Sequence, residues 1–120
     1  MAAYEAIDLP EDRRDCWVGW ERGLGALDPT DRHRTVARFG TVYGIVAAVE
    51  AGMGRAWLPC FVGDAASGLS RVEGSHQAGS SALRLLTHRD LRRTARVRAL
   101  LRHLAEALLP MKERFSGAAR

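Results

Sequence analysis

The chain has 120 residues, of which 47% are hydrophobic and 27% are charged, as in an ordinary soluble globular domain. We expect one domain, because a typical domain takes about 100 to 150 residues. No apolar run reaches the roughly 20 residues that a membrane-spanning helix needs. The acidic start MAAYEAIDLPEDRRD also lacks the basic-then-apolar layout of a secretion signal. These features predict a cytoplasmic protein.

The net charge of +4 conceals a gradient along the chain. Residues 1–31 carry a net charge of −5, whereas residues 84–120 carry +7. Of the 18 basic residues 17 are arginine, which we interpret as the codon usage of a GC-rich bacterial genome. The basic end of the chain raises the question of nucleic-acid binding, and its periodicity must be considered first.

The first predicted elements follow a polar lead over residues 1–14. Residues 16–20 and 35–39 have the composition of short strands, and the stretch between them is rich in glycine and proline and is expected to be a loop. Thr41 is placed to cap a helix that begins at Val42. Gly52 is placed to end that helix in a left-handed conformation.

A third strand is predicted over residues 55–58. Only two residues separate it from the helix, so we expect it to return beside residues 35–39 as the parallel partner in a βαβ unit. Pro59 indicates a strand end followed by a short helical turn. Residues 69–72 and 82–87 are predicted to be two further strands, with a loop over 73–81. The pattern as a whole predicts an α/β fold with a mostly parallel sheet.

The last predicted element is an amphipathic helix that Asp90 caps and Pro110 ends, with a frayed tail over residues 111–120. Its apolar stripe comprises Leu91, Ala95, Val97, Leu100, Leu101, Leu104, Ala105 and Leu108. The arginines of this segment mostly lie elsewhere on the helical wheel, which favours a solvated face. The alternative is a small arginine-rich nucleic-acid-binding or protein-interaction module. Against it, the segment has neither interleaved aromatic residues nor a turn-plus-recognition-helix pattern.

Three stretches resemble one protein family. Residues 47–61, AAVEAGMGRAWLPCF, are similar to the A-V-x-A-G-L-G-x-A-x-L-P-x-F segment of the effector-binding domain of LysR-type transcriptional regulators. The run WVGW at 17–20 resembles the strand that precedes this segment in the family. LLTHRDLR at 85–92 and RVRALL at 96–101 resemble its last strand and closing helix. The order and spacing of the three stretches hold across residues 15–109.

The resemblance implies a partial type 2 periplasmic-binding-protein-like domain. On that mapping residues 15–81 are the second subdomain, residues 82–109 are the crossover strand and closing helix, and residues 110–120 are a tail. We expect a truncated reading frame or a fragment, because the family's DNA-binding helix-turn-helix has no counterpart here. The implied function is sensing of a small effector, a carboxylate or an aromatic metabolite. Self-association is expected, and neither a cofactor nor a membrane partner is expected.

Gly40, Thr41 and Trp57 are the candidate effector-binding residues. A helix that begins after a strand presents free N–H groups and the Thr41 hydroxyl to an anion, although Thr41 is equally well explained as a plain N-cap. Trp57 is placed either to line the effector pocket or to pack in the core. Arg38 is placed to pair with an effector carboxylate, but a solvated side chain is favoured.

Catalytic and metal sites are not indicated by the sequence. Cys16 and Cys60 form neither a disulfide framework nor a set of metal ligands. Cys60 opens the predicted helical turn, where a thiol is placed to be reactive, but a buried structural thiol is favoured because no base is placed beside it. The four histidines lack metal-ligand spacing. They are His33, His76, His88 and His103. We therefore predict a protein that is not an enzyme and binds no metal.

Overall fold

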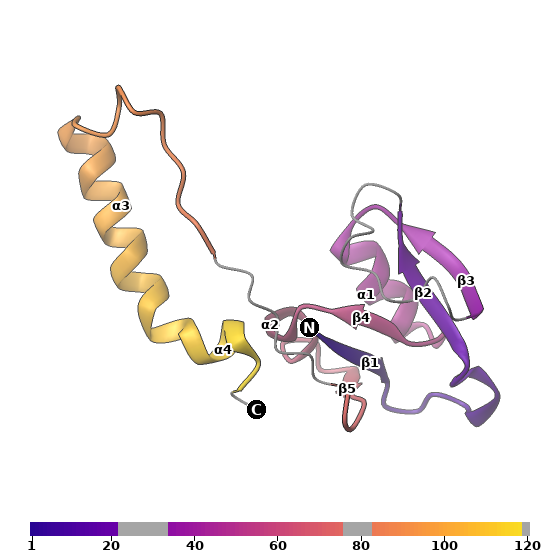
Figure 1. The fold of residues 1–120 in the computed structure, drawn as a ribbon. Coiled ribbons are helices and arrows are strands. Elements are labelled where there is room, and N and C mark those ends of the chain that lie inside the picture. Colours follow the sequence, from indigo (N-terminus) through magenta and orange to yellow (C-terminus); the bar gives the residue numbers. More distant parts are fainter. Residues whose placement is uncertain (22–33, 76–82, 119–120) are drawn as a thin grey trace.

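The computed structural model describes residues 1–21, 34–75 and 83–118 (Figure 1). Residues 1–21 and 34–75 form a mixed α/β body, and residues 83–118 form a helical arm. The strands are β1 (Ala2–Ala6), β2 (Cys16–Trp20), β3 (Arg34–Phe39), β4 (Ala56–Leu58) and β5 (Leu69–Arg71). The α-helices are α1 (Val42–Glu50), α2 (Cys60–Gly63), α3 (Ala95–Leu108) and α4 (Lys112–Ser116), with 3-10 turns η1 (Glu11–Arg13) and η4 (Leu109–Met111). No helix within the described residues is long and apolar enough to cross a membrane.

The strands form two small sheets that meet edge to edge. Strand β1 lies between β4 and β5 and is antiparallel to both, whereas β2 and β3 are parallel. A single parallel bridge between Trp17 and Arg55 joins the sheets. There the Val18 N–H donates to the Arg55 carbonyl at 2.8 Å, and the Arg55 N–H donates to the Cys16 carbonyl at 2.9 Å. The strands therefore follow one another across the body in the order β3, β2, β4, β1, β5.

The core lies between one face of these strands and helix α1. Side chains alternate between the two faces of a strand, so Ala2 and Tyr4 of β1 share a face with Leu58 and Ala56 of β4. The buried cluster on this face comprises Ala2, Tyr4, Val18, Ile45, Ala48, Val49, Ala56, Leu58, Cys60 and Leu69. Three of these residues come from α1, at the spacing of one helical face.

Much of the predicted local structure is confirmed. Strands β2, β3 and β5 lie within a residue of the predicted ranges, and α2 is the short helical turn expected after Pro59. Helix α1 begins at Val42 after the Thr41 cap. Gly52, which follows the helix, has a φ of +76°, the left-handed conformation that glycine adopts without steric cost.

The prediction that the third strand pairs beside residues 35–39 is wrong. Strand β4 lies one position farther along, next to β2, so that β2 stands between β3 and β4. The expectation of a mostly parallel sheet is also not confirmed, since both neighbours of β1 are antiparallel to it. The coarser prediction of a mixed α/β fold holds.

The amino-terminal segment is more than a polar lead. Residues 2–6 form β1, the central strand of its sheet, with Ala2, Ala3 and Tyr4 no more than 1% exposed. Alanine has a low intrinsic preference for strands, and burial here comes from pairing with segments more than 50 residues away. A local sequence pattern therefore gave no signal for this strand.

The carboxy-terminal segment also differs from the prediction. Residues 83–88 are extended but form no strand, because no described strand lies beside them to share backbone hydrogen bonds. Helix α3 begins at Ala95, with Thr94 in the N-cap position, whereas the Asp90 N–H bonds the His88 ring. The helix ends before Pro110 as expected, but α4 follows in place of a frayed tail.

Tyr4 connects four elements of the molecule. Its hydroxyl donates to Asp64 Oδ1 at 2.8 Å and lies 3.3 Å from the Cys60 carbonyl, and its ring packs against Gly63, where any Cβ would come within 2.5 Å. Arg71 of β5 bonds the same Asp64 carboxylate, lies over the Tyr4 ring, and donates to the Gly117 carbonyl at 3.0 Å. This Tyr4 network therefore holds β1, α2, β5 and the end of α4 together.

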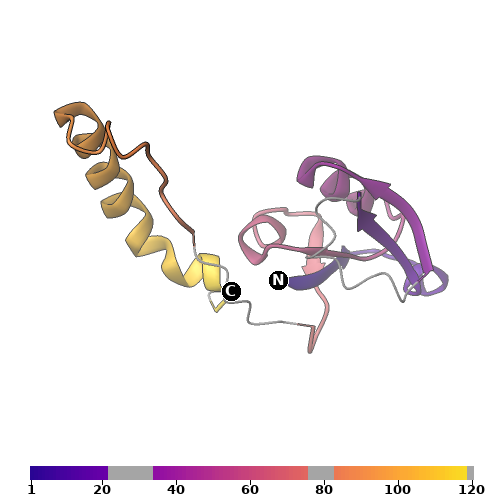
Figure 2. The ribbon, with the colours of Figure 1, turned by 45° about the horizontal axis from the view of Figure 1, so that its top comes forward.

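Helix α3 stands away from the body, and the arm meets the body through α4 (Figures 1 and 2). The contact is a T-shaped pair of Phe61 on α2 and Phe115 on α4, with ring centroids 5.1 Å apart. No residue of α3 is buried. The radius of gyration is 17.0 Å, against about 14 Å for a compact domain of this length. The chain is therefore extended, and the apolar stripe of α3 lacks a covering surface among the described residues.

We expect Tyr4→Phe to lower the free energy of unfolding by about 1 to 2 kcal/mol, because a partly buried hydrogen bond to a carboxylate is lost. Burial, followed by the bond to Asp64, raises the pKa of Tyr4. The folded state therefore resists its ionisation, and stability is lost as the pH rises above the unfolded value of about 10. Urea titrations at pH 7 and above pH 10 measure both effects. Tyr43→Phe is the control, because Tyr43 is 84% exposed. Equal effects of the two substitutions would contradict the assigned role of the Tyr4 network.

We expect the isolated chain to self-associate through α3. Each large apolar side chain left in water forgoes roughly 1.5 to 3 kcal/mol, and Val97, Leu101, Leu104 and Leu108 share one face of this helix with no buried member. Light scattering after size exclusion should give a mass above 13.2 kDa. The double change Leu101→Gln and Leu104→Gln should restore the monomer, whereas Ala99→Gln on the opposite face should not. A monodisperse wild-type monomer would show the expectation to be wrong.

Candidate functional site

The carboxyl ends of β2, β3 and β4 meet at one edge of the body. Strands β2 and β3 are parallel, and β4 joins β2 through a parallel bridge, so all three strands end on the same side of the body. In open α/β sheets this is the edge at which small molecules bind. Trp20, Phe39 and Leu58 are the last residues of the three strands.

Thr41 lies at this edge as the N-cap of α1. Its backbone is extended, with φ −129° and ψ 146°, and its Oγ1 accepts a hydrogen bond from the Gly44 N–H at 3.1 Å. Gly44 leaves room for this arrangement, because a Cβ there would lie 3.1 Å from the Phe39 ring and 3.2 Å from Thr41 Oγ1. The predicted cap is confirmed. The effector role of Thr41 stays a prediction.

Gly40 lies beside an acidic side chain. Glu21 follows β2, and its N–H donates to the Phe39 carbonyl at 3.0 Å. A Cβ on Gly40 would come within 2.8 Å of Glu21 Oε2, so the carboxylate lies against the glycine backbone. Arg38 reaches the same edge and donates to the Trp20 carbonyl at 3.0 Å. The edge therefore carries charges of both signs.

Trp57 lies on the face of the sheet opposite α1. Its ring stacks on Trp17, with centroids 6.2 Å apart and planes inclined by 14°. Its carbonyl accepts from Trp20 Nε1 at 3.2 Å. Within the described residues the Trp57 Nε1 atom is buried and has no hydrogen-bond partner. An orphaned buried donor costs about 1 to 3 kcal/mol, so this N–H is an unsatisfied group inside the body.

The structure brings the three predicted site residues only partly together. Gly40 and Thr41 adjoin at the strand edge. Trp20, which pairs with Phe39 at that edge, donates its indole N–H to the Trp57 carbonyl. The Trp57 ring, however, points to the face away from α1. Sequence reasoning did not single out Glu21, because its approach to Gly40 depends on the parallel pairing of β2 with β3.

Cysteine and histidine side chains form no cluster in the described part of the chain. Cys16 and Cys60 are buried and free. Cys60 begins α2, and its carbonyl is the acceptor near Tyr4. His88 contacts Asp90, while His33 and His76 lie outside the described residues. Over residues 1–21, 34–75 and 83–118, no group of three or more His, Cys, Asp or Glu side chains is placed to hold a metal ion.

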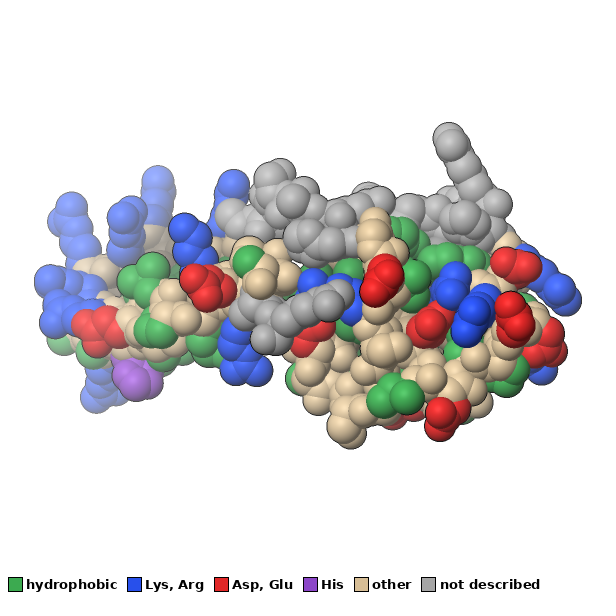
Figure 3. Space-filling view, turned by 90° about the horizontal axis from the view of Figure 1, so that it is seen from below, with side chains coloured by type: hydrophobic (Ala, Val, Ile, Leu, Met, Phe, Trp, Pro, Cys, Tyr) green, Lys and Arg blue, Asp and Glu red, His purple; other side chains and the backbone are tan. Residues whose placement is uncertain are grey.

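Basic side chains gather on the arm, as the space-filling view shows over α3 (Figure 3). The arginines of this segment that lie on or just before α3 are all exposed: Arg92, Arg93, Arg96, Arg98 and Arg102. The only aromatic ring that follows on the arm, Phe115, is engaged with Phe61. Exposure agrees with the solvated face that was favoured from the sequence.

Parallel strand ends joined to a helix N-terminus are typical of α/β domains. The sequence profile of the LysR substrate binding domain matches residues 2–109. The chain therefore belongs to the LysR substrate-binding domain family, which senses effectors in transcriptional regulators and has a periplasmic-binding-protein-like α/β fold. The match begins at β1, earlier than the resemblance over residues 15–109. No curated protein and no solved structure matches the chain.

We expect Thr41→Ala to destabilise the chain by about 1 kcal/mol, because the Gly44 N–H loses its acceptor at the start of α1. Thr41→Ser should restore most of this loss, since its hydroxyl occupies the same place. Thermal unfolding monitored by circular dichroism measures the difference. Unchanged stability in the alanine variant would contradict the capping role.

Proposed function

We propose that this chain is the effector-sensing part of a LysR-type transcriptional regulator. The observation that carries the proposal is the family match over residues 2–109. The ligand is a small carboxylate or an aromatic metabolite bound at the edge formed by β2, β3 and β4. Like the other cytoplasmic members of the family, the protein uses no catalytic residue, metal or cofactor for this role.

The strand edge offers three kinds of contact to such a ligand. Thr41 and the first N–H groups of α1 present hydrogen-bond donors and the positive end of the helix dipole. Arg38 supplies a cation that offsets Glu21, so a carboxylate at this edge does not face an uncompensated acid. The Trp57 ring, stacked on Trp17, offers a flat surface that suits an aromatic group.

The division of the chain follows the family resemblance. Residues 15–81, extended by β1, form the second subdomain, and residues 82–109 are the crossover and closing helix. In the intact regulator a partner subdomain covers the apolar stripe of α3, and DNA is bound by a separate helix-turn-helix domain. Effector binding shifts the relative placement of the subdomains, and with it the arrangement of the dimer.

Two other functions have less support. A nucleic-acid-binding role would rest on the exposed arginines of the arm, but these carry charge without aromatic stacking partners on α3. A catalytic role for Cys60 would need an accessible thiol, and Cys60 is only 3% exposed.

A panel of carboxylates headed by benzoate tests the proposal. We expect benzoate to raise the melting temperature of the 120-residue chain, because a ligand that binds the folded state stabilises it. The rise should be smaller in Trp57→Phe, which replaces the indole by a smaller ring, and in Arg38→Gln. It should be unchanged in Thr87→Ala, an exposed residue of the arm.

The panel includes aromatic and aliphatic acids, so that it covers both proposed ligand classes. A panel in which no member shifts the melting temperature would contradict effector binding by this chain. Equal shifts in the wild type, Trp57→Phe and Arg38→Gln would place the ligand elsewhere.

A further inference from the structure

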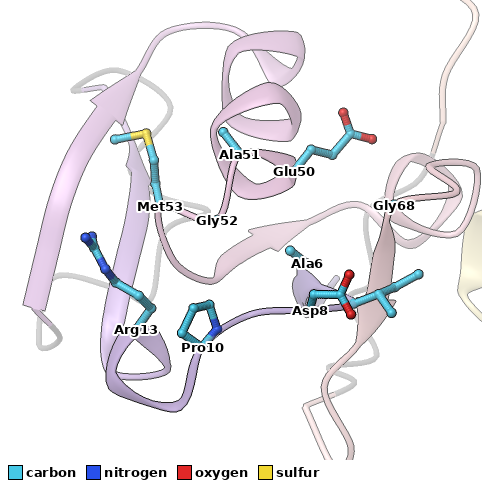
Figure 4. A pocket seen from close by; sticks show the side chains of 10 residues that line it. Ala6, Asp8, Pro10, Arg13, Glu50, Ala51, Gly52, Met53 and Gly68 are labelled. Atoms are coloured by element: carbon cyan, nitrogen blue, oxygen red, sulfur yellow. The ribbon is translucent and has the colours of Figure 1, made fainter.

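A cavity of about 680 Å³ lies at the other end of α1, away from the strand edge. It opens where the chain enters β2 and β4, between the carboxyl end of α1 and the segment after β1 (Figure 4). Its lining residues are Ala6, Ile7, Asp8, Pro10, Arg13, Glu50, Ala51, Gly52, Met53 and Gly68. This volume is within the range of small-molecule sites, roughly 300 to 1,000 Å³.

Charges of opposite sign lie on opposite sides of this cavity. Figure 4 shows Asp8 and Glu50 on the side of Gly68, whereas Arg13 lies on the far side with Met53. Within the described part of the chain, none of the three charged side chains forms an ion pair or hydrogen bond with another residue. The cavity therefore has one acidic wall and one basic wall, and neither is neutralised by the protein.

Gly68 contacts both segments that carry the acidic residues of this wall. Its carbonyl accepts from the Ile7 N–H at 3.2 Å, which places Asp8 at the end of β1 beside it. The Glu50 side chain lies over the same glycine, where a Cβ would be 3.5 Å from Glu50 Oε1. Asp8 and Glu50 thus come from segments more than 40 residues apart and both line the cavity on the side of Gly68.

The dipole of helix α1 adds to the negative character of this wall. The helix ends at Glu50, with Ala51 and Gly52 bonded back to its last turn, so its carboxyl end and the negative end of its dipole face the cavity. A cation is favoured there. A bare divalent ion is not, because only two carboxylates are present and Arg13 shares the cavity.

We propose that this cavity binds a small zwitterion, with its ammonium group at Asp8 and Glu50 and its carboxylate at Arg13. Ammonium donors match the carboxylate oxygens, and the guanidinium fork matches a carboxylate. Ala6 and Pro10 between the walls, with Met53 beside Arg13, provide an apolar floor for a short aliphatic chain. The ligand class is an amino acid whose two charged groups are separated by several methylene groups.

The proposed ligand is tested with 5-aminopentanoate on the isotope-labelled 120-residue chain, by following amide chemical shifts. We expect saturable shifts at Gly52 and Gly68. Pentylamine and pentanoate, which each carry one of the two charges, should bind about two- to fivefold more weakly, as expected for the loss of one partly solvated ion pair. Pentylamine binding as tightly as 5-aminopentanoate would overturn the role of Arg13.

Matched variants separate the two walls. Arg13→Gln and Glu50→Gln should each weaken 5-aminopentanoate binding about two- to fivefold. The neighbouring changes Arg14→Gln and Asp12→Asn, outside the lining, should leave it unchanged. All four side chains are exposed, so the fold is preserved. Absence of saturable shifts, or equal effects of lining and control variants, would overturn the proposal. None of these residues belongs to the strand edge, so failure here is distinct from failure of effector binding there.

Discussion

The burial of β1 is the constraint on which the rest of the structure depends. This strand contributes backbone hydrogen bonds to β4 on one side and β5 on the other, and its Tyr4 hydroxyl and ring reach α2, Asp64 and Arg71. A buried tyrosine requires a partner for its hydroxyl, and here the partner carboxylate is itself bonded by the arginine that holds Gly117. One side chain of the first strand is therefore linked, through Asp64 and Arg71, to Gly117 at the end of α4.

The contacts made through β1 fix only one end of the arm and leave helix α3 exposed. Phe115 and the Gly117 carbonyl fix α4 against the body, but α3 gains no buried residue from that contact. Domains become stable when the apolar face of each helix or strand packs against another layer of structure. The apolar face of α3 has no such layer among the described residues.

Local sequence patterns predicted most helices and strands of the body, but not the order in which the strands pair. Thr41, Gly52 and Pro59 act through their own backbones, so the limits of α1 and α2 were readable from the sequence. Strand β1 and the position of β4 depend on pairing between distant segments, to which short patterns give no access. The same reason explains the site: Thr41 was predicted as a cap, whereas the approach of Glu21 to Gly40 arises only after β2 and β3 pair.

The two proposed sites lie at the two ends of one helix. A helix of 9 residues is about 14 Å long, with a partial positive charge at its first turn and a partial negative charge at its last. The strand edge at Thr41 thus favours an acceptor or carboxylate, and the cavity at Glu50 favours an ammonium group. The packed residues Ile45, Ala48 and Val49 hold α1 against the sheet between them. Helix α1 therefore joins the two proposed sites through a close-packed face, with opposite ends of its dipole at each.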